Sequence, residues 1–564
     1  EISCSLVGSE MCIRDSSIPV RFFIALLIYF SWGPLAGGVV TAPVPEFSSP
    51  ALIPYPSKVV RGAGEAGFRS VQVKVGPDVP GRDDLMKEIK DIFRTSGIQG
   101  SLNSGGAAEG AMTWELFPDA RMKGEGYDLS VGLGKATVRA GSFGGFFNAL
   151  QTLRQLVFNR EGEFAMPVVR ISDKPAFVLR GVMLDVGRYY MSPALIKEVM
   201  RRLSRYKINT LHLHLTDDPA WRMEVKKYPA LTDGAFHWKS RLPGRFYTQA
   251  QLKDLTDYCA RLNIQVIPEI DMPGHSQPFA RAMKTGMQTE KGVSILKDVV
   301  DEAVSLFPGR FFHMGSDEAH ISMKDFIPRM AEHIRGKGKE VVVWSPGGPH
   351  DKDSVLMCWG ENEAGARMDK NMKRIDSNGF YIDWADSQSG VYQVFFQQPC
   401  EVPQGDDKAL GAIMPVWCDG NLSSERRVLE QYPFYPCALT FAERVWRGSA
   451  TKRRDYMAQL PPRGTDGWKE FREFEQRLAF HRDHFFQGVP FAYVKQADVA
   501  WSLVGPFDHR GKNDTSFEPE RRIAPSYRDG DRILAWKKTP VYGAAVHVLS
   551  LIHISEPTRL QLIS

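Results

Sequence analysis

The fold of this chain is indicated by residues 177–218, which run FVLRGVMLDVGRYYMSPALIKEVMRRLSRYKINTLHLHLTDD. Two short apolar runs, Phe177–Val186 and Ile208–Leu215, flank a segment whose apolar residues recur at helical spacing. Between them, Ser192 and Pro193 are residue types preferred at the cap and in the first turn of a helix. The stretch therefore predicts a strand, a helix and a second strand, a unit typical of sheets with parallel strands.

Similar apolar runs recur up to residue 450, most of them separated by segments with helical spacing. A second helix is expected to begin at Thr248, because Gln251 follows at the spacing of a capping box. Eight such units match a (β/α)8 TIM barrel in number and in size. The expected strands are Phe177–Val186, Ile208–Leu215, Ile264–Ile270, Arg310–Met314, Glu340–Trp344, Ser354–Trp359, Gly379–Asp383 and Leu410–Trp417.

The barrel over residues 176–450 is expected to be the catalytic part of an α/β protein with further segments on both sides. Residues 43–175 mix helical and strand-like patterns and predict a small N-terminal α+β domain. Residues 451–487 predict a helical segment, and residues 488–548 predict a short, truncated β-rich C-terminal segment. In the small domain, helices are expected over Arg82–Phe93 and Phe143–Phe158, and strands over Val71–Val75 and Tyr127–Val131.

Both ends of the sequence predict features outside the folded domains. Residues 1–16 and 549–564 resemble translated sequencing-adapter read-through. Residues 17–42 predict a signal peptide, since Arg21 precedes the apolar run Phe22–Phe30, which is too short to span a bilayer. We therefore expect an exported protein, periplasmic or extracellular, without a stable membrane span after cleavage. An uncleaved membrane anchor is the alternative.

The charge balance argues against a nucleic-acid partner. The chain has 71 basic and 66 acidic residues, a formal net charge of +5, and no long basic run. Residues 317–320 spell Asp-Glu-Ala-His, which in another setting would suggest a helicase. A helicase also needs the phosphate-binding loop GxxxxGKS or GxxxxGKT, and neither pattern occurs in the sequence.

Neither the histidines nor the cysteines predict a metal centre. His212 and His214 share a strand face and could form half of a metal site, but no third ligand has a suitable spacing. Buried, hydrogen-bonded histidines are the favoured interpretation, and no metal or cofactor is expected. The cysteines form no CxxC pair, so buried thiols are expected, and one disulfide bond remains possible. Outside residues 1–16 they are Cys259, Cys358, Cys400, Cys418 and Cys437.

Acidic and aromatic side chains collect where the expected strands end. Because the chemistry of TIM barrels takes place at the carboxyl ends of the strands, these side chains should face one another. Indole rings cover the apolar faces of a pyranose, and carboxylates accept hydrogen bonds from its hydroxyl groups. The pattern therefore indicates a sugar site. Its members on or after the strands are Arg180, Asp185, Asp217, Glu269, Asp271, His275, Asp317, Glu318, Trp344, Trp359, Tyr381, Asp383 and Trp417.

Three motifs within these segments resemble one known family. Residues 180–232, which begin RGVMLDVGRYY, residues 267–275 (IPEIDMPGH) and residues 313–318 (HMGSDE) are similar to the glycoside hydrolase family 20 β-N-acetylhexosaminidases. The resemblance covers roughly residues 50–450 and includes the small domain that precedes the barrel in that family. It implies an exo-acting, retaining enzyme that hydrolyses terminal β-linked GlcNAc or GalNAc on an oligosaccharide or glycoconjugate.

The resemblance also implies roles for individual residues. Glu318 would be the general acid/base, and an ionised Asp317 would orient the 2-acetamido group of the substrate. The acetamido oxygen would attack the anomeric carbon and form an oxazolinium intermediate, so no protein carboxylate would act as the nucleophile. The other implied residues are the pocket walls Trp344, Trp359 and Trp417, the acetamido partner Tyr381, the relay pair Asp217 and His275, and the sugar-positioning residues Arg180, Asp383 and Asp419.

The sequence departs from the family pattern at two positions. Ser316 stands where the family usually has a second glycine, and Asp419 stands where the family commonly has a glutamate. The shorter carboxylate leaves the preference between gluco and galacto sugars open. The alternative functions are an inactive sugar-binding protein on the same scaffold, or a related family activity such as lacto-N-biosidase. The oligomeric state is also open.

Overall fold

The computed structural model of the chain describes most residues between 50 and 493. The described ranges are 50–102, 109–160, 163–360, 368–382, 389–420, 422–449, 461, 464–491 and 493, with the backbone of four strands between residues 500 and 553. The predicted signal peptide over residues 17–42 and the adapter-like residues 1–16 lie outside them. Every helix within the described ranges is too short or too polar to cross a membrane.

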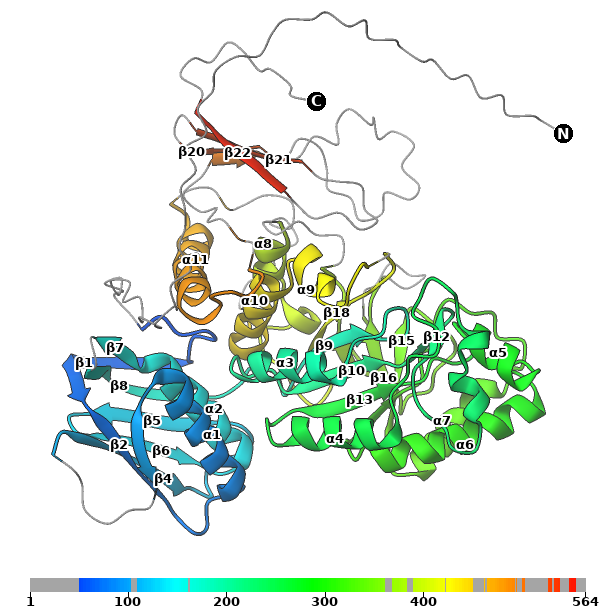
Figure 1. Cartoon of the computed structure of the whole chain (residues 1–564), viewed down its shortest axis with the longest axis horizontal. Coiled ribbons are helices and arrows are strands. Elements are labelled where there is room, and N and C mark those ends of the chain that lie inside the picture. The colour runs from blue at the N-terminus through cyan, green and yellow to red at the C-terminus, as the bar shows by residue number, and fades with distance from the viewer. Residues whose placement is uncertain are drawn as a thin grey trace, which may run out of the picture. The chain divides into compact units, whose positions relative to one another are not determined.

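Residues 179–416 contain a closed barrel of eight parallel strands, which confirms the predicted TIM barrel (Figure 1). Strand β14 (Phe311–His313) is short and pairs with β13 (Gln265–Glu269) at one position, where Glu269 lies opposite His313. The other strands are β9 (Leu179–Asp185), β10 (Thr210–His214), β15 (Glu340–Ser345), β16 (Val355–Cys358), β17 (Lys373–Asp376) and β18 (Ala409–Val416).

The seventh strand lies earlier in the chain than the sequence analysis placed it. Strand β17 is formed by Lys373–Asp376, and the expected strand Gly379–Asp383 is wrong. The prediction failed because two of the four residues in β17 are charged side chains that become buried. Asp376 accepts a hydrogen bond from the backbone N–H of Cys400, and Arg374 donates to the carbonyl of Lys370. These tertiary partners satisfy polar groups that apolar patterning cannot reveal.

Helices connect most of the barrel strands, and two of them begin as predicted. The Ser192 hydroxyl accepts the N–H of Leu195 at the start of α3 (Pro193–Ser204). Thr248 and Gln251 form the predicted capping box at the start of α4 (Gln249–Ala260). The remaining barrel helices are α5 (Gln277–Met283), α6 (Glu290–Leu306), α7 (Phe326–Gly336), α8 (Ser389–Phe396), α9 (Arg427–Gln431) and α10 (Phe434–Arg447).

The small domain is a mixed sheet covered by two helices, α1 (Arg82–Ser96) and α2 (Phe143–Leu156) (Figure 1). The buried face of α1 carries Leu85, Ile89 and Ile92, which recur at the helical spacing seen in the sequence. The strands are β1 (Lys58–Phe68), β2 (Ser70–Val75), β3 (Gln99–Leu102), β4 (Ala111–Pro118), β5 (Tyr127–Gly132), β6 (Lys135–Ala140), β7 (Phe158–Arg160) and β8 (Glu163–Asp173).

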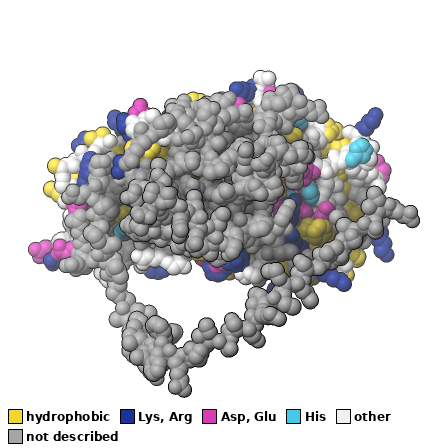
Figure 2. Space-filling view, turned by 90° about the horizontal axis from the view of Figure 1, so that it is seen from above, with side chains coloured by type: hydrophobic (Ala, Val, Ile, Leu, Met, Phe, Trp, Pro, Cys, Tyr) yellow, Lys and Arg dark blue, Asp and Glu magenta, His cyan; other side chains and the backbone are white. Residues whose placement is uncertain are grey.

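After the barrel, α11 (Asp466–Phe485) corresponds to the predicted C-terminal helix and bonds to α10 through Arg477 and Glu443. Four antiparallel strands follow: β19 (Ala500–Ser502), β20 (Ser526–Asp529), β21 (Arg532–Lys537) and β22 (His547–His553). The rest of the Trp501–Phe507 run lies outside the described residues. On the face shown in Figure 2, acidic and basic side chains are interspersed wherever atoms are described, without a broad patch of either sign.

A buried ion pair joins the small domain to the barrel. The ammonium group of Lys207, which precedes β10, lies 3.1 Å from Asp173 at the end of β8, and both side chains are almost fully buried. Asp173 also accepts hydrogen bonds from the Tyr127 hydroxyl and the Trp446 indole. A buried charge is tolerated only when it is paired and hydrogen-bonded, so these groups depend on one another.

Replacing Asp173→Asn should therefore destabilise the protein strongly. The change leaves the Lys207 ammonium buried without a counter-charge, which costs about 3–5 kcal/mol in comparable buried pairs. Urea unfolding followed by tryptophan fluorescence measures the loss. The control is Glu163→Gln, which breaks an exposed pair with Arg69 (67% and 76% exposed) and should change stability little. Equal effects of the two variants would contradict the prediction.

Candidate active site

The turn after β14 places Asp317 and Glu318 in different surroundings. Gly315, Ser316 and Glu318 adopt φ angles of 66°, 84° and 49°, so the chain turns sharply as it leaves the strand. Asp317 is half-buried, whereas the Glu318 side chain is 61% exposed. One carboxyl group is therefore partly enclosed by protein, and the other is open to a bound molecule.

Two buried acids from β13 and the loop after it act on Asp317. Asp271 is fully buried, and its Oδ1 accepts the backbone N–H of Ser316 at 3.3 Å. Burial and the charges of Glu269 and Glu318 raise the pKa of Asp317 to about 7. Burial and the charges of Glu269 and Asp317 raise the pKa of Asp271 well above its usual range. The surroundings therefore favour the protonated form of Asp271, and with a pKa of about 7 Asp317 is only partly ionised at neutral pH in the unliganded protein.

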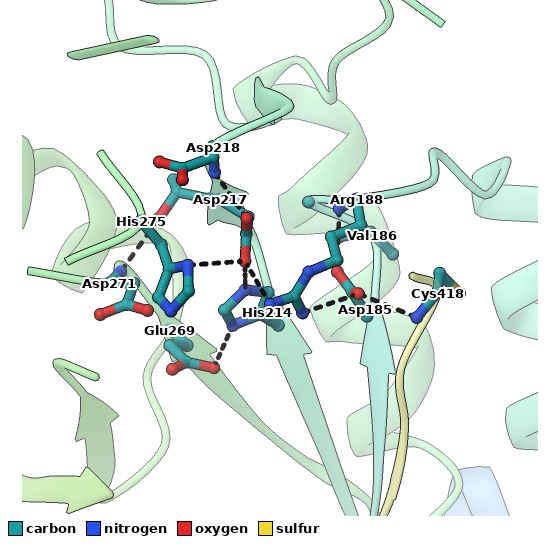
Figure 3. Close-up of polar contacts among 12 residues, drawn as sticks. Asp185, Val186, Arg188, His214, Asp217, Asp218, Glu269, Asp271, His275 and Cys418 are labelled. Carbon is teal, nitrogen blue, oxygen red and sulfur yellow. Dashed lines mark hydrogen bonds and ion pairs between the residues drawn. The ribbon is translucent and has the colours of Figure 1, made fainter. Parts of the chain in front are cut away.

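His275 lies between Glu318 and Asp217. Its Nε2 is 3.6 Å from Oε2 of Glu318, and its Nδ1 is 3.6 Å from Oδ2 of Asp217. Figure 3 shows His275 and His214 approaching Asp217 from two sides, and Nε2 of His214 is 3.0 Å from the same Asp217 oxygen. The structure brings together the side chains for which the resemblance implies a relay.

Arg188, which follows β9, is the cation that faces these acids. Its guanidinium nitrogens lie 3.2 Å from Asp185, 3.0 Å from Asp217 and 3.2 Å from Asp419, and the group lies 4.6 Å from the centre of the Trp417 ring. Burial opposes the charge, but the three carboxylates raise the pKa of Arg188 beyond its usual range. Arg188 was not predicted as a site residue, although it stands three residues after Asp185, at the carboxyl end of the first strand.

Arg180 lies at the other end of β9, and its predicted place in the site is wrong. The side chain is fully buried and donates to the carbonyls of Lys207 and Phe177 at 2.8 and 2.9 Å. It also pairs with Glu125 of the small domain. Because β9 continues for five residues beyond Arg180 towards the site, this arginine serves the junction between the domains.

Three of the four predicted aromatic residues contact one another directly. Trp344 is 1% exposed, and its indole N–H donates to Oε1 of Glu269 at 2.7 Å. Its ring centre lies 5.7 Å from that of Trp417, which in turn lies 6.5 Å from that of Tyr381. Trp359 is half-buried and donates its indole N–H to the carbonyl of Pro346 at 2.8 Å. The described protein therefore presents Trp417, Tyr381 and Trp359 as partly exposed aromatic surfaces, with Trp344 behind them.

Of the two remaining predicted residues, Asp419 lies within the described residues and Asp383 does not. Asp419 follows β18, and its side chain is 58% exposed beside Arg188. Arg241 fixes this segment by donating to the carbonyls of Cys418 and Gly420 at 2.9 and 2.8 Å, as well as to that of Asp419. Burial raises the pKa of Asp419 above its ordinary value. Asp383 lies outside the described residues.

Acidic and histidine side chains also form three groups close enough to hold a metal ion among the described residues. One fully buried group consists of His212, Glu269 and His313, which supplies third ligands that the sequence spacing did not suggest. In it, Nδ1 of His313 accepts the Gly315 N–H at 3.0 Å and Oε1 of Glu269 accepts the Trp344 indole N–H, whereas neither ring nitrogen of His212 has a hydrogen-bond partner among the described residues. Both other groups contain Asp271, whose raised pKa favours the protonated form, which is a poor metal ligand. Several ligand atoms of these groups are therefore already used in hydrogen bonds.

The cysteines take no part in this arrangement as a covalent bridge. All five thiols outside residues 1–16 are buried, and none forms a disulfide bond. Burial raises the pKa of Cys259 to about 12 and that of Cys400 well above its usual range, so neither is a reactive thiolate.

The arrangement is suited to acid-assisted cleavage of a bond between sugars. An open carboxyl group, Glu318, stands beside a partly enclosed one, Asp317, and a cation, Arg188, is held among three carboxylates. Aromatic faces for a pyranose ring lie next to them.

Family models match both folded parts of the chain. Residues 177–291 match the model "Glycosyl hydrolase family 20, catalytic domain", and residues 49–174 match "Glycosyl hydrolase family 20, domain 2". A beta-N-acetylhexosaminidase from Cellulomonas fimi is 30% identical over 454 residues, which cover 71% of this chain and 86% of that protein. A beta-hexosaminidase from Porphyromonas gingivalis is 31% identical over 59% of this chain. The chain spans only 52% of that relative's length, and 63% of a similar one from Vibrio furnissii.

Solved structures of the same family share the fold. A mutant Streptomyces plicatus beta-hexosaminidase in complex with the product GlcNAc superposes with a TM-score of 0.65 at 24% identity, covering 79% of this chain and 97% of that one. An exo beta-N-acetylglucosaminidase from Vibrio harveyi gives a TM-score of 0.64 at 22% identity, covering 79% and 78% of the two chains.

The strained serine in the loop gives a stability prediction. Ser316 has φ 84°, and its buried hydroxyl has no hydrogen-bond partner among the described residues. Ser316→Gly should raise the free energy of unfolding by about 0.5–1 kcal/mol. Left-handed φ costs a side-chain-bearing residue about 1–2 kcal/mol, and glycine's greater freedom in the unfolded chain offsets roughly 0.5–1 of this gain. Thermal unfolding measures the change.

The neighbouring glycine supplies the control. A Cβ at Gly315 would overlap the carboxylate of Asp271, so Gly315→Ser should lower the melting temperature while Ser316→Gly raises it. A lowered melting temperature for Ser316→Gly would contradict the role of φ strain.

Proposed function

The chain belongs to glycoside hydrolase family 20, and from this membership we propose that it is an exo-acting, retaining β-N-acetylhexosaminidase. Its substrates are oligosaccharides or glycoconjugates that end in β-linked N-acetylglucosamine or N-acetylgalactosamine. The relatives named beta-hexosaminidase support this class of reaction. Catalysis is assisted by the acetamido group of the substrate.

The contrast between Asp317 and Glu318 carries the proposal. The exposed Glu318 carboxyl can reach a glycosidic oxygen, and bound substrate would cover it from water. The partly enclosed Asp317 can meet the acetamido N–H of a sugar held against the aromatic side chains. A second carboxylate used as a nucleophile would have to reach the anomeric carbon itself, and a half-buried Asp317 is better suited to the acetamido group.

The reaction proceeds in two steps. Glu318 gives its proton to the glycosidic oxygen while the acetamido oxygen forms a bond to the anomeric carbon, and the bond to the leaving sugar breaks. The positive charge of the resulting oxazolinium ion lies next to ionised Asp317. Glu318, now a carboxylate, takes a proton from water as the water oxygen attacks the anomeric carbon, and two inversions give net retention.

Arg188 and Asp419 bind the outer hydroxyl groups of the same sugar. Arg188 is held among Asp185, Asp217 and Asp419, and the aromatic ring of Trp417 lies beneath it. Asp419 is shorter than the glutamate common in the family, so the choice between gluco and galacto sugars depends on its reach. We also propose export of the protein, on the basis of the signal-peptide pattern over residues 17–42.

Glu318→Gln should abolish most hydrolysis of substrates whose leaving group needs a proton from the enzyme. Loss of a general acid costs about 10²–10⁴-fold in rate. The measurement is kcat/KM for methylumbelliferyl N-acetyl-β-glucosaminide, compared with a dinitrophenyl glycoside that needs little protonation and should lose much less. Glu290→Gln, which alters an exposed glutamate on α6 paired with Arg329, should leave both rates unchanged.

Different outcomes separate the alternative functions. A wild-type protein that binds N-acetylglucosamine but releases no aglycone between pH 4 and 8 would be a sugar-binding protein. Release of an intact disaccharide from an aryl lacto-N-bioside, without release of single N-acetylhexosamines, would indicate lacto-N-biosidase activity. Turnover of an aryl β-glucoside, which has no acetamido group, at a comparable rate would exclude substrate assistance.

The pKa of Asp317 predicts the acidic limb of the pH profile. Burial and the charges of Glu269 and Glu318 raise this pKa to about 7, so the carboxyl is protonated below that pH and cannot support the oxazolinium charge. Because kcat/KM reports the free enzyme, it should fall about tenfold per pH unit below the pKa. Asp317→Asn should have low activity without this limb. A wild-type profile that is flat from pH 5 to 8 would contradict the assignment.

A further inference from the structure

Beneath the candidate active site, one carboxylate is shared by ring nitrogens from three neighbouring strands. Glu269, the last residue of β13, is fully buried. Its Oε2 lies 2.6 Å from Nδ1 of His214 and 2.9 Å from Nε2 of His212, both on β10. Its Oε1 lies 2.7 Å from Nε1 of Trp344 on β15 and 3.3 Å from Nδ1 of His313 on β14. No step of the proposed reaction uses this group.

The geometry makes His214 a cation. Both of its ring nitrogens face carboxylate oxygens, with Nδ1 towards Glu269 and Nε2 towards Asp217 at 3.0 Å (Figure 3). A carboxylate accepts hydrogen bonds, so both nitrogens must carry protons. Burial opposes this charge, but Glu269 and Asp217 raise the pKa of His214 well above its ordinary value. The charge of Asp185 also raises this pKa. The Trp417 ring lies 5.0 Å from the imidazole in an edge-to-face arrangement.

Glu269 therefore has a short hydrogen bond to a residue in each half of the site. On one side, His214 joins it to Asp217 by hydrogen bonds, and His275 lies 3.6 Å from both Asp217 and Glu318. On the other side, Glu269 accepts the indole N–H of Trp344, and the centre of the Trp344 ring lies 5.7 Å from that of the Trp417 ring. The charged and titratable groups that face it are His212 and His214 of β10, His313 of β14, Asp271 beyond its own strand, and Asp317.

We propose that Glu269 is a positioning residue that fixes the acid relay and the tryptophan wall of the site relative to each other. This inference rests on the proposed glycosidase function. By keeping His214 charged, Glu269 holds Asp217 ionised and in place behind His275. By accepting the Trp344 N–H, it sets the plane of an indole that lies behind the sugar-facing rings. One carboxylate thus aligns the proton donor and the acetamido pocket, which must act on the same sugar at the same time.

Glu269→Gln tests the proposal, because the amide keeps the shape and changes the protons. The Gln carbonyl oxygen can still accept the Trp344 N–H. Its NH2 group then faces Nδ1 of His214, which must release its proton and become an acceptor. The relay loses the imidazolium charge, and the buried negative charge near Asp317 is lost as well.

We expect kcat/KM for the methylumbelliferyl substrate to fall about 10²-fold, as for a small misplacement of reacting groups. The dinitrophenyl substrate, which needs little protonation, should lose less. The acidic limb of the profile should move to lower pH, because the charge of Glu269 raises the pKa of Asp317 more than the charge of His214 lowers it. His214→Gln removes the imidazolium that links Glu269 to Asp217, and its activity should depend on the leaving group in the same way. This second variant tests the proposal even if Glu269→Gln does not fold.

The matched control is Glu443→Gln on α10. Glu443 is as buried as Glu269, and its partners, the guanidinium of Arg477 and the backbone N–H of Tyr55, lie outside the candidate site. Its loss should lower stability but leave the pH profile and the ratio of the two substrates unchanged. A Glu269→Gln or His214→Gln enzyme with the wild-type pH profile and substrate ratio would overturn the proposal. An inactive wild type would instead overturn the proposed function.

Discussion

The barrel mouth is governed by the repulsion among carboxyl groups gathered in one buried layer. Asp185, Asp217, Glu269 and Asp271 are all buried, and Asp317 lies beside them. Isolated buried carboxylates are very costly, so each needs a proton or a positive partner. Arg188 pairs with Asp185 and Asp217, the His214 imidazolium bonds to Asp217 and Glu269, and the raised pKa of Asp271 favours its protonated form. Among these five carboxyl groups, Asp317 has a pKa of about 7, close to neutral pH. A bound ligand can therefore change its protonation.

The same constraint explains how an arginine and a histidine organise this layer. A guanidinium can meet several carboxylates at once, because its donors point in fixed and different directions. Arg188 uses this property to reach Asp185, Asp217 and Asp419, which come from three separate segments of the barrel. A sugar hydroxyl can join such a network as both donor and acceptor without disturbing its charge balance.

The sequence predicted the barrel and most of the strand-end residues because strands and helices repeat at regular periods, and the motifs fall where strands end. It failed where burial depends on partners distant in the chain. Strand β17 carries Asp376, which can be buried because it accepts the backbone N–H of Cys400, 24 residues further along the chain. Arg180 was chosen over Arg188 although it precedes the core of its strand. The direction of a parallel strand alone would have favoured the arginine at the carboxyl end.

The brevity of β14 has a consequence for local stability. With a single residue pair between β13 and β14, the seam next to the catalytic loop has few ladder hydrogen bonds of its own. The seam is reinforced from inside the barrel, where Glu269 of β13 accepts ring N–H groups from His214 of β10 and Trp344 of β15, the strands on either side of β13 and β14. In most sheets the backbone holds the side chains in register; here side chains help to hold the backbone. Amide hydrogens along this seam should therefore exchange at a rate set by the protonation of the buried rings.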